Sequence, residues 1–393
     1  MDDGIDVVMG KKHRHIAVYI TLDTGYSRSI IQGIADYARQ HMDWTVHLQF
    51  RDTPARFDKR SLERFDGLIV RLHQKRQDNS LVKTGVPTVN ISALLPPTRI
   101  PTVVTDNITV GAMAAEHLLR LRATNFAFCG YPGPYYTAQR KLGFDMRLKQ
   151  DGFTCSHYFK FPAFQTWINN PGIETEMTRW LTQLPKPVGL FTHTDTAGWT
   201  MAEACQLAEL RVPEDIAIIS VDNDELLCQL ARPKLSSVDT GTQRVGHEAA
   251  RLLNEMIDGR PIPQSPLVIP PVSVVERQSS DIVFVQDSML VSAIRFIRDN
   301  IEEAINVEDV VEYVCVSRST LERRFLNQFN RSVADEIRRT RLERAKYLLT
   351  RTDLTLMQVA IRCGYPFQQR MSTCFREHLN MSPSQYRKQY KIR

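Results

Sequence analysis

Several polar side chains in the first two-thirds of the chain stand directly after short apolar runs, where they could bind a polyhydroxylated ligand. Carboxylates accept paired hydrogen bonds from vicinal hydroxyls, and an aromatic ring can cover the apolar face of a sugar. The residues in these positions are Asp23, Tyr26 and Arg28 after HRHIAVYI, Asp106 after VVT, Asp195 after FTHT, and Asp222 after IAIISV. As a converging set they predict a carbohydrate site. Each aspartate alone could equally be a helix N-cap, above all Asp106 and Asp195.

Arg71 follows the run DGLIV, near the place where a site between strand ends should open. A cation there could contact a carboxylate-bearing ligand such as a sugar acid. The alternative, which is the commoner fate of such a residue, is that Arg71 lies on the surface or pairs with a neighbouring aspartate.

The elements that would position these side chains alternate between strands and helices over residues 14–280. The runs WTVHLQF, DGLIV, VPTVNI, NFAFCG, VGLFTHT and IAIISVDND predict strands, and SRSIIQGIADYARQH, VGAMAAEHLLRL and TQRVGHEAARLLNEMIDG predict helices. This alternation is typical of βαβ units and parallel sheets. Roughly 270 residues are many for one sheet, so we expect two α/β lobes. Ligands of such folds bind outside the carboxyl ends of the strands.

The net charge of the 393-residue chain is concentrated at one end. Residues 1–284 hold 31 Lys and Arg against 31 Asp and Glu, whereas residues 285–393 hold 19 against 13 and carry the whole excess of +6. A basic block of this kind is the electrostatic footprint of a nucleic-acid-binding module, although a solvated helical surface can have the same composition.

The basic region contains an internal repeat with a period of fifty residues. SRSTLERRFLNQFNRS (317–332) aligns with FQQRMSTCFREHLNMS (367–382), so that Phe325 matches Phe375. A shorter apolar-periodic helix precedes each copy, and Gly364 and Pro366 break the second of these helices before its partner begins. Helix, short turn and helix is the helix-turn-helix plan.

The exposed faces of the two repeated helices are predicted to bind double-stranded promoter DNA. Glutamine pairs with adenine and arginine with guanine in the major groove, while further arginines neutralise phosphates. The predicted base-reading residues are Ser319, Glu322 and Arg323 in the first copy, and Gln368, Gln369, Ser372, Thr373 and Arg376 in the second. The predicted phosphate contacts are Arg318, Arg324, Arg331, Arg338, Arg339, Arg341 and the basic residues of the terminal RKQYKIR (387–393).

Residues 286–393 resemble the DNA-binding domain of AraC/XylS-type regulators. The resemblance is carried by SRSTLERRF, RLERAKYLL, QVAIRCGY and MSPSQYR. It implies an all-α domain in which the helix RLERAKYLL rigidly joins two helix-turn-helix units, which read groove faces about 34 Å apart. Cys315, Asn330 and Asn380 stand where the family usually has glycine; asparagine is the other residue that visits the left-handed region.

Residues 14–283 are similar to the two-lobed, periplasmic-binding-protein-like sensor of LacI-type regulators. VVTDNITVGAMAAEHLL, AQRKLGF, THTDTAGW, ISVDND and PKLSSVDT carry the similarity. It implies that the chain crosses between the lobes three times, that a sugar lies between them, and that two copies dimerise through the lobe nearer the N-terminus. By the same resemblance, Arg140, Asp222 and Asp195 contact ligand hydroxyls. Thr240 stands where many members have a ligand-binding glutamine.

A sensor of this type placed before an AraC-type module resembles regulators of the xylose operon (XylR type), with residues 1–13 as an N-terminal tail. The resemblance implies a sugar-responsive transcriptional regulator, an activator, whose effector is xylose or a related pentose. It also implies a homodimer and, for an activator, RNA polymerase as a partner. The alternative is a soluble sugar-binding protein without regulatory DNA activity.

Several other classes of function are not favoured. The chain contains no GxxxxGK[ST], GxSxG or HExxH motif and no GxGxxG after a strand, so we expect no catalytic residues and no cofactor. Seven cysteines without CxxC spacing predict neither disulfides nor a metal site. No apolar run approaches the roughly 18 residues of a membrane span, and the acidic opening MDDGIDVVMG lacks a signal-peptide pattern, so we expect a cytoplasmic protein.

Overall fold

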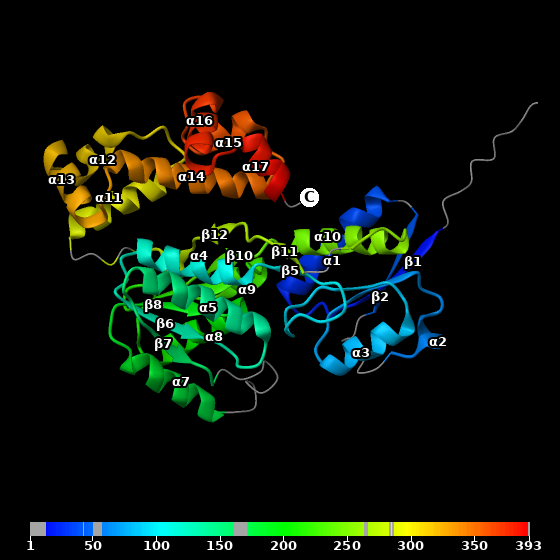
Figure 1. Ribbon diagram of the computed structural model, residues 1–393. Helices are drawn as coiled ribbons and strands as arrows, with labels where there is room; N and C mark the ends of the chain where they lie inside the picture. Colours follow the sequence, from blue (N-terminus) through cyan, green and yellow to red (C-terminus); the bar gives the residue numbers. More distant parts are fainter. Residues whose placement is uncertain are drawn as a thin grey trace, which may run out of the picture.

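The computed structural model describes residues 13–41, 43–49, 57–160, 171–262, 266–282, 284 and 287–391. Two α/β lobes come first in this part of the chain, and an all-helical module follows them (Figure 1). The predicted fold class is therefore confirmed. The predicted N-terminal tail lies outside the described residues apart from His13, and the predicted boundary between residues 283 and 286 falls on residues that are not described.

The first lobe is built on a four-stranded parallel sheet in the order β2-β1-β3-β4. Helices α1 and α10 pack against each other beside this sheet, and Ile30, Ile34 and Leu253 are buried between helices and strands. The elements are β1 (Arg14–Tyr19), α1 (Gly25–Gln40), β2 (Trp44–Gln49), α2 (Lys59–Leu62), β3 (Gly67–Val70), α3 (Lys75–Thr84), β4 (Thr88–Asn90) and α10 (Thr242–Ile257).

The second lobe contains a six-stranded sheet in the order β12-β10-β9-β8-β6-β7, in which only β12 is antiparallel to its neighbour. Its central strands are buried on both faces, which explains their unbroken apolar sequences. The elements are α4 (Asn107–Arg120), β6 (Asn125–Cys129), α5 (Tyr135–Gln150), β7 (Cys155–Tyr158), α7 (Pro171–Gln183), β8 (Val188–Thr192), α8 (Asp195–Leu207), β9 (Ile216–Val221), α9 (Glu225–Leu230), β10 (Ser236–Asp239), β12 (Ser273–Val275) and the short 3-10 helix η1 (Gln278–Ser280).

The chain crosses between the lobes three times, as the resemblance to LacI-type sensors implies. Strand β5 (Val103–Thr105) leads into α4, β10 leads through Thr240 into α10, and β11 (Leu267–Ile269) leads into β12. Strands β5 and β11 pair in parallel with each other. The three crossings therefore lie close together and form a hinge-like connection between two sheets.

The helical module consists of α11 (Ser288–Asp299), α12 (Val307–Val314), α13 (Arg318–Phe329), α14 (Val333–Arg351), α15 (Leu356–Arg362), α16 (Gln368–Leu379) and α17 (Pro383–Tyr390). It has two apolar cores, one around Phe325 and the other around Phe375, the residues that the repeat aligns. The predicted joining segment RLERAKYLL lies inside α14, which runs unbroken from one core to the other (Figure 1).

Left-handed backbone at helix ends explains the departures from the AraC-type pattern. Cys315, Asn330 and Asn380 have φ values of 54°, 51° and 52° at the C-caps of α12, α13 and α16. Gly364 has φ 66°, and a Cβ on it would lie 2.3 Å from the carbonyl oxygen of Glu303. Only glycine lets the turn before α16 approach the first unit this closely.

Candidate functional site: an interlobe cluster and two exposed helices

Five side chains from both lobes form what we call the interlobe cluster: Tyr26, Arg71, Tyr136, Arg140 and Asp222. Tyr26 lies in the first turn of α1 and Arg71 follows β3, both in the first lobe. The other three belong to α5 and to the loop after β9 in the second lobe. The charges of Arg71, Arg140 and Asp222 all influence the pKa of Tyr26, which places the five groups in one neighbourhood at strand and helix ends.

Arg140 is the anchor of the cluster in the second lobe and is only 4% exposed. Its Nε donates to Asn107 Oδ1 at 2.9 Å, one terminal nitrogen donates to Asp222 Oδ1 at 3.2 Å, and the other donates to the carbonyl oxygen of His193. These partners come from the start of α4 and from the loops after β8 and β9. A guanidinium fixed by three partners is a rigid donor at the lobe boundary.

Asp222 lies in an unusual backbone conformation directly after β9. Its φ is 107°, and Asn223 follows with φ 50°, so the chain turns sharply at the end of the strand. Arg277 stabilises the turn by donating to Asn223 Oδ1 at 2.8 Å. Burial raises the pKa of Asp222, and the charge and hydrogen bond of Arg140 oppose that rise. Non-glycine residues in such conformations concentrate at functional sites.

Two tyrosines complete the cluster from opposite lobes. The guanidinium carbon of Arg140 lies 4.9 Å from the ring centroid of Tyr136, and that of Arg71 lies 5.8 Å from the ring centroid of Tyr26. Burial raises the pKa of Tyr26 to about 12, and it also raises the pKa of Tyr136. Both phenols are therefore neutral at physiological pH. Tyr136 precedes Arg140 by one turn of α5 and shares its face; the sequence did not single it out.

Three other residues predicted to bind the ligand have local partners in this structure. Asp106 is the N-cap of α4 and accepts from Thr109 N at 2.9 Å, which is the alternative that the sequence left open. Asp23 is exposed and accepts from the hydroxyl of Thr21. Arg28 forms an ion pair with Asp224 at 2.7 Å. The assignment of these three residues to the ligand site stays a prediction.

Asp195 is enclosed within the second lobe. It accepts from the hydroxyl of Ser237 and the backbone N of Asp224, both at 2.6 Å, and from the hydroxyl of Ser220. Burial raises its pKa to about 7. The N-cap of α8 is Thr194 rather than Asp195, so the expectation of an N-cap at Asp195 is wrong by one residue. Asp195 supports the loop that carries Asp222.

Asp224 connects the two lobes, a role that the sequence did not reveal. Its Oδ2 accepts from Gly25 N at 2.9 Å and from Arg28 at 2.7 Å, both at the start of α1. A Cβ on Gly25 would lie 2.6 Å from the side chain of Asp224, so the contact requires glycine. Tyr136 N also donates to Ala93 O in the first lobe at 2.9 Å. These bonds hold the lobes together around the cluster.

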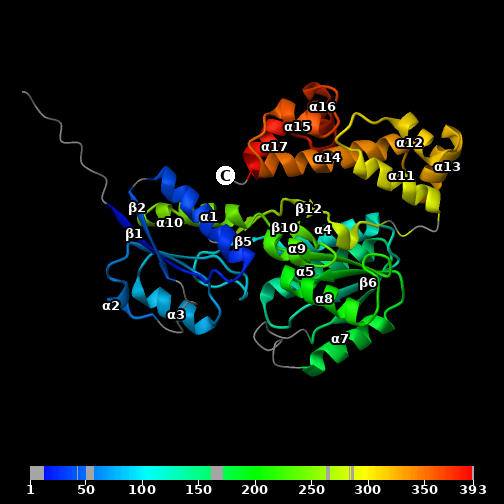
Figure 2. The same cartoon turned by 180° about the vertical axis from the view of Figure 1, so that it is seen from behind.

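The second predicted DNA-reading helix presents a polar face to solvent. In α16, Met371 and Phe375 are buried, whereas Gln369, Thr373 and Arg376 are exposed. Gln368 and Ser372 are half-buried beside them. The helix lies at the edge of the module that points away from the lobes (Figure 2). This orientation leaves the whole face accessible to a duplex.

Sequence reasoning missed two exposed residues at the start of this helix. Phe367, the N-cap position of α16, is 69% exposed. Such a ring could contact a thymine methyl group in the major groove. Arg370 is also exposed, and the described part of the chain offers it no ion-pair partner. These two residues could have been predicted from the sequence, because a large apolar residue is followed closely by an arginine at the start of a polar helix.

The first unit exposes Ser319 and Arg323 on α13, while two of its predicted DNA residues have partners within the module. Glu322 Oε2 accepts from Val333 N at 3.3 Å, and Arg318 pairs with Glu308 at the surface. Surface pairs of this kind contribute little to stability, so Arg318 remains available for a phosphate. Glu322 instead accepts a hydrogen bond from a free backbone N–H group in the first turn of α14.

Three of the arginines predicted to contact phosphates are engaged inside the module, which corrects that part of the prediction. Arg331 and Arg339 both pair with Glu336, which is 1% exposed. Arg341 donates to the carbonyl oxygen of Ile305 at 2.7 Å. Removing a partner from a buried carboxylate is costly, so we assign these arginines a structural role. Arg324 and Arg338 form exposed pairs.

Helix α17 connects the helical module to the sensor at the crossings between the lobes. The phenol oxygen of Tyr386 lies 3.4 Å from the carbonyl oxygen of Val272, just before β12. Arg244 of α10, in the first lobe, lies 5.4 Å from the ring centroid of Tyr390. On the other side, Arg298 of α11 pairs with Asp281 at 2.8 Å. The module thus contacts segments that belong to both lobes.

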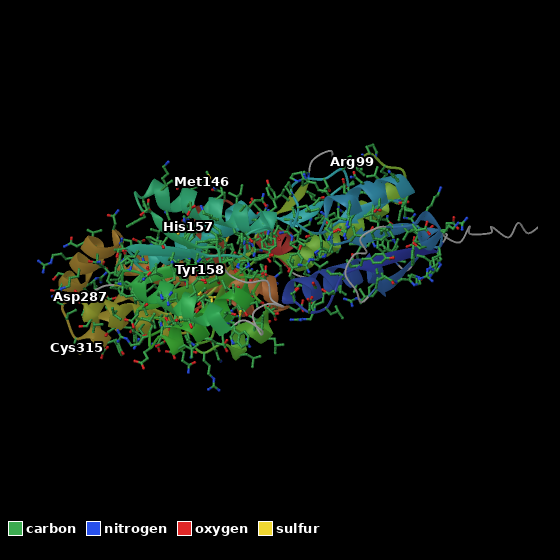
Figure 3. All side chains as sticks on the ribbon, turned by 90° about the horizontal axis from the view of Figure 1, so that it is seen from below. Arg99, Met146, His157, Tyr158, Asp287 and Cys315 are labelled. Carbon is green, nitrogen blue, oxygen red and sulfur yellow. The ribbon has the colours of Figure 1, made fainter. Side chains whose placement is uncertain are left out.

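One group of potential metal ligands occurs in the described residues: Asp145, Cys155 and His157, whose ligand atoms lie within 4.8 Å of one another. His157, labelled in Figure 3, belongs to β7, the edge strand of the six-stranded sheet, and pairs with Asp145 at 3.1 Å. Lys141 pairs with the same carboxylate at 2.5 Å. Burial raises the pKa of Cys155 far above its usual range, so its thiol is a poor metal ligand.

No helix within the described ranges is both long and apolar enough to cross a membrane.

Two family models match this chain. A periplasmic binding protein-like domain covers residues 115–280, and a helix-turn-helix domain covers residues 310–389. The chain is 28% identical over 389 residues to the xylose operon regulatory protein of Haemophilus influenzae, covering 96% of this chain and 99% of that protein. It is 29% identical over 388 residues to the xylose operon regulatory protein of Escherichia coli, covering 96% and 97%.

Among solved structures, that of a xylose-binding transcription activator matches 98% of this chain and all of that one, at 27% identity and a TM-score of 0.62. A LacI-family regulator of Enterococcus faecium with bound ribose matches 69% of this chain and all of its own, at 20% identity and a TM-score of 0.58, and supports the fold of the sensor.

Proposed function

We propose that this chain, which is similar along nearly its whole length to the xylose operon regulatory proteins, is a sugar-sensing transcriptional regulator, and that the interlobe cluster is where its sugar binds. The observation that carries this proposal is the fixed Arg140–Asp222 pair opposite Tyr26 and Arg71 at the boundary between the lobes. These relatives are regulators, which does not favour a plain sugar-binding protein or an enzyme.

The chemistry of the cluster suits a monosaccharide of pentose size. Asp222 accepts hydrogen bonds from vicinal hydroxyls, Arg140 donates to ring or hydroxyl oxygens, and the two neutral phenols donate and accept. The rings of Tyr26 and Tyr136 can cover the apolar faces of a sugar. The predicted effector, xylose or a related pentose, fits this set, and the structure with bound ribose shows that the fold accommodates such ligands.

DNA binding is assigned to the exposed faces of α13 and α16. The residues we propose to contact bases are Ser319 and Arg323 in the first unit, and Gln368, Gln369, Ser372, Thr373 and Arg376 in the second, with Phe367 added from the structure. Arg318 and Arg370 are proposed to contact phosphates. The rigid helix α14 fixes the spacing of the two units, as two successive major-groove faces require.

Coupling follows from the position of α17 on the crossings between the lobes. A sugar that binds both lobes favours one arrangement of Arg244 relative to Val272, because a ligand shifts an equilibrium only through its differential affinity for two states. Tyr386 and Tyr390 touch these two residues from the helical module. A change in lobe angle is therefore passed to the module that carries α13 and α16.

We further propose a cytoplasmic homodimer that activates transcription together with RNA polymerase. Support for self-association comes from a groove of about 400 Å³ on the first lobe, lined largely by apolar side chains that include Ile31, Ala38, Val46 and Leu48. A second copy of the chain is the occupant we assign to it. Val46→Glu should turn the dimer into a monomer in analytical ultracentrifugation, and a dimer that persists would refute this assignment.

Titration calorimetry with the full-length protein tests the proposed sugar site. The protein should bind at least one sugar or sugar acid of pentose size, and Asp222→Ala should abolish that binding without changing the unfolding temperature by more than a few degrees. Unaltered binding in the variant would reject the site.

A further inference from the structure

Arg71 lies at the boundary between the lobes, and the described residues offer it no ion-pair partner within salt-bridge distance. Its Nε is buried, and no hydrogen-bond acceptor for that atom lies within the described part of the chain. Its backbone N donates to Tyr19 O at 3.3 Å, which fixes the main chain at the end of β3. The surface position and the pairing with a neighbouring aspartate, which the sequence left open, do not occur in this structure.

The other charges of the interlobe cluster are already balanced. Arg140 is paired with Asp222, and Asp224 is paired with Arg28. Asp195 accepts from Ser220, Ser237 and the backbone N of Asp224. His193 is neutral, because burial and then the charge of Arg140 lower its pKa to about 3. Arg71 forms no ion pair of its own with a described residue, although its charge acts on Asp222, which is already paired with Arg140.

The ring of Tyr26 is the one favourable contact that this guanidinium makes with a neighbouring side chain in the described residues. A cation–π contact at 5.8 Å stabilises a cation weakly, and it satisfies none of the donors in the guanidinium plane. A buried donor without an acceptor is costly, and in the half-buried Arg71 this cost falls on Nε. A guanidinium recognises a carboxylate best, because the two groups form parallel hydrogen bonds.

We infer that the effector carries a carboxylate, and that Arg71 binds this carboxylate while Asp222 and Arg140 bind hydroxyls at the other end of the molecule. The inference rests on the proposed sugar site and names its ligand class: a sugar acid related to a pentose or hexose, rather than the neutral sugar. Binding places the anion of the ligand on the first lobe and its hydroxyls on the second. The ligand therefore bridges the lobes.

The test is titration calorimetry of the full-length protein with matched pairs of neutral and acidic sugars: xylose and xylonate, galactose and galacturonate, glucose and glucuronate. At least one acid should bind tighter than its neutral counterpart by 10-fold or more. Arg71→Gln, which keeps a hydrogen-bond donor but is shorter and removes the charge, should weaken that acid by roughly 10- to 100-fold and leave the neutral sugar within about 3-fold. Arg76→Gln, at an exposed position of α3, is the matched control and should change neither.

Two results would overturn the inference. One is a neutral pentose that binds at least as tightly as every acid, and the other is an acid whose affinity is unchanged by Arg71→Gln. If the neutral sugar binds and Asp222→Ala abolishes its binding, the proposed sugar site survives and only the carboxylate is lost. If no sugar of either kind binds to a protein that unfolds cooperatively, both proposals fall.

Discussion

The phenol oxygen of Tyr386 in α17 lies 3.4 Å from the carbonyl oxygen of Val272, in the last of the three segments that cross between the lobes. Tyr386, which is buried in the second core of the helical module, thus also contacts the segment that crosses between the lobes. Tyr390, one turn later on the same helix, is reached by Arg244 from the first lobe. Helix α17 is therefore one of the physical connections between the helical module and the sensor, and it reaches segments next to the proposed sugar site.

Severing this connection should uncouple the two functions. In Arg244→Ala the cation–π contact with Tyr390 is lost, so lobe movement is passed to the module less effectively. We expect the variant to bind the sugar with nearly unchanged affinity. The change that the sugar causes in the free energy of DNA binding should be less than half of that in the natural protein. Fluorescence anisotropy with labelled DNA measures the effect. Among the described residues, Arg251 on the same helix pairs only with Glu248 and Glu255, so Arg251→Ala should leave the coupling intact.

The ion pair between Arg28 and Asp224 should act as a latch between the lobes rather than as a ligand contact. Arg28→Ala is expected to weaken sugar binding by about 3- to 10-fold, because the liganded arrangement of the lobes loses a contact. A double-mutant cycle with Asp224→Asn distinguishes the two roles. If Arg28 acts through Asp224, the double variant binds sugar no more weakly than Asp224→Asn alone. Additive losses would show that Arg28 contacts the sugar directly.

Two arginines of the helical module should respond differently to substitution. Arg376→Ala on the exposed face of α16 should weaken DNA binding by about 1–3 kcal/mol and leave the unfolding temperature unchanged. Arg339→Ala should instead lower the unfolding temperature, because it leaves Glu336 with one partner fewer in a buried site. Thermal denaturation combined with anisotropy over a range of salt concentrations separates these effects. If Arg339→Ala lost much DNA affinity but no stability, the original prediction that Arg339 contacts a phosphate would be supported.

The stability of the second lobe should depend on pH through Asp195. Burial raises the pKa of this carboxyl to about 7 in the folded protein, whereas in the unfolded chain it is about 3.9. Between these values the folded state holds one more proton, so the contribution of Asp195 to stability falls as pH rises from about 4 to 7. Asp195→Asn removes this titration. The unfolding temperature of the natural protein relative to that of Asp195→Asn should therefore fall over this range, and a constant difference would contradict the assignment.

The sequence predicted those parts of the site that depend on local pattern or on family resemblance. The alternation of strands and helices predicted two lobes, and the fifty-residue repeat predicted two similar helical units with Phe325 and Phe375 in their cores. Resemblance alone indicated Arg140, because α5 carries no pattern that marks a polar residue for burial. The left-handed positions of Asn330 and Asn380 followed from the conformational range of asparagine.

Other features depend on tertiary contacts that one sequence does not encode visibly. Asp222 and Asp224 are two residues apart, yet the sharp turn sends one carboxylate to Arg140 and the other to Arg28 in the opposite lobe. Charge counting likewise treated Arg331 and Arg339 as free cations, although both pair with the buried Glu336. Composition gives the sum of charges in a region, and only the folded structure shows which of them are already paired.

The most direct test of the central claim is the affinity of the full-length protein for DNA from beside its own gene, measured by anisotropy at fixed ionic strength with and without the sugar or sugar acid that binds best. The account predicts that the ligand changes the DNA dissociation constant by at least about 5-fold. It also predicts that Asp222→Ala binds the DNA as the unliganded natural protein does and no longer responds. A DNA affinity that is the same with and without every such ligand, or a full response in Asp222→Ala, would contradict it.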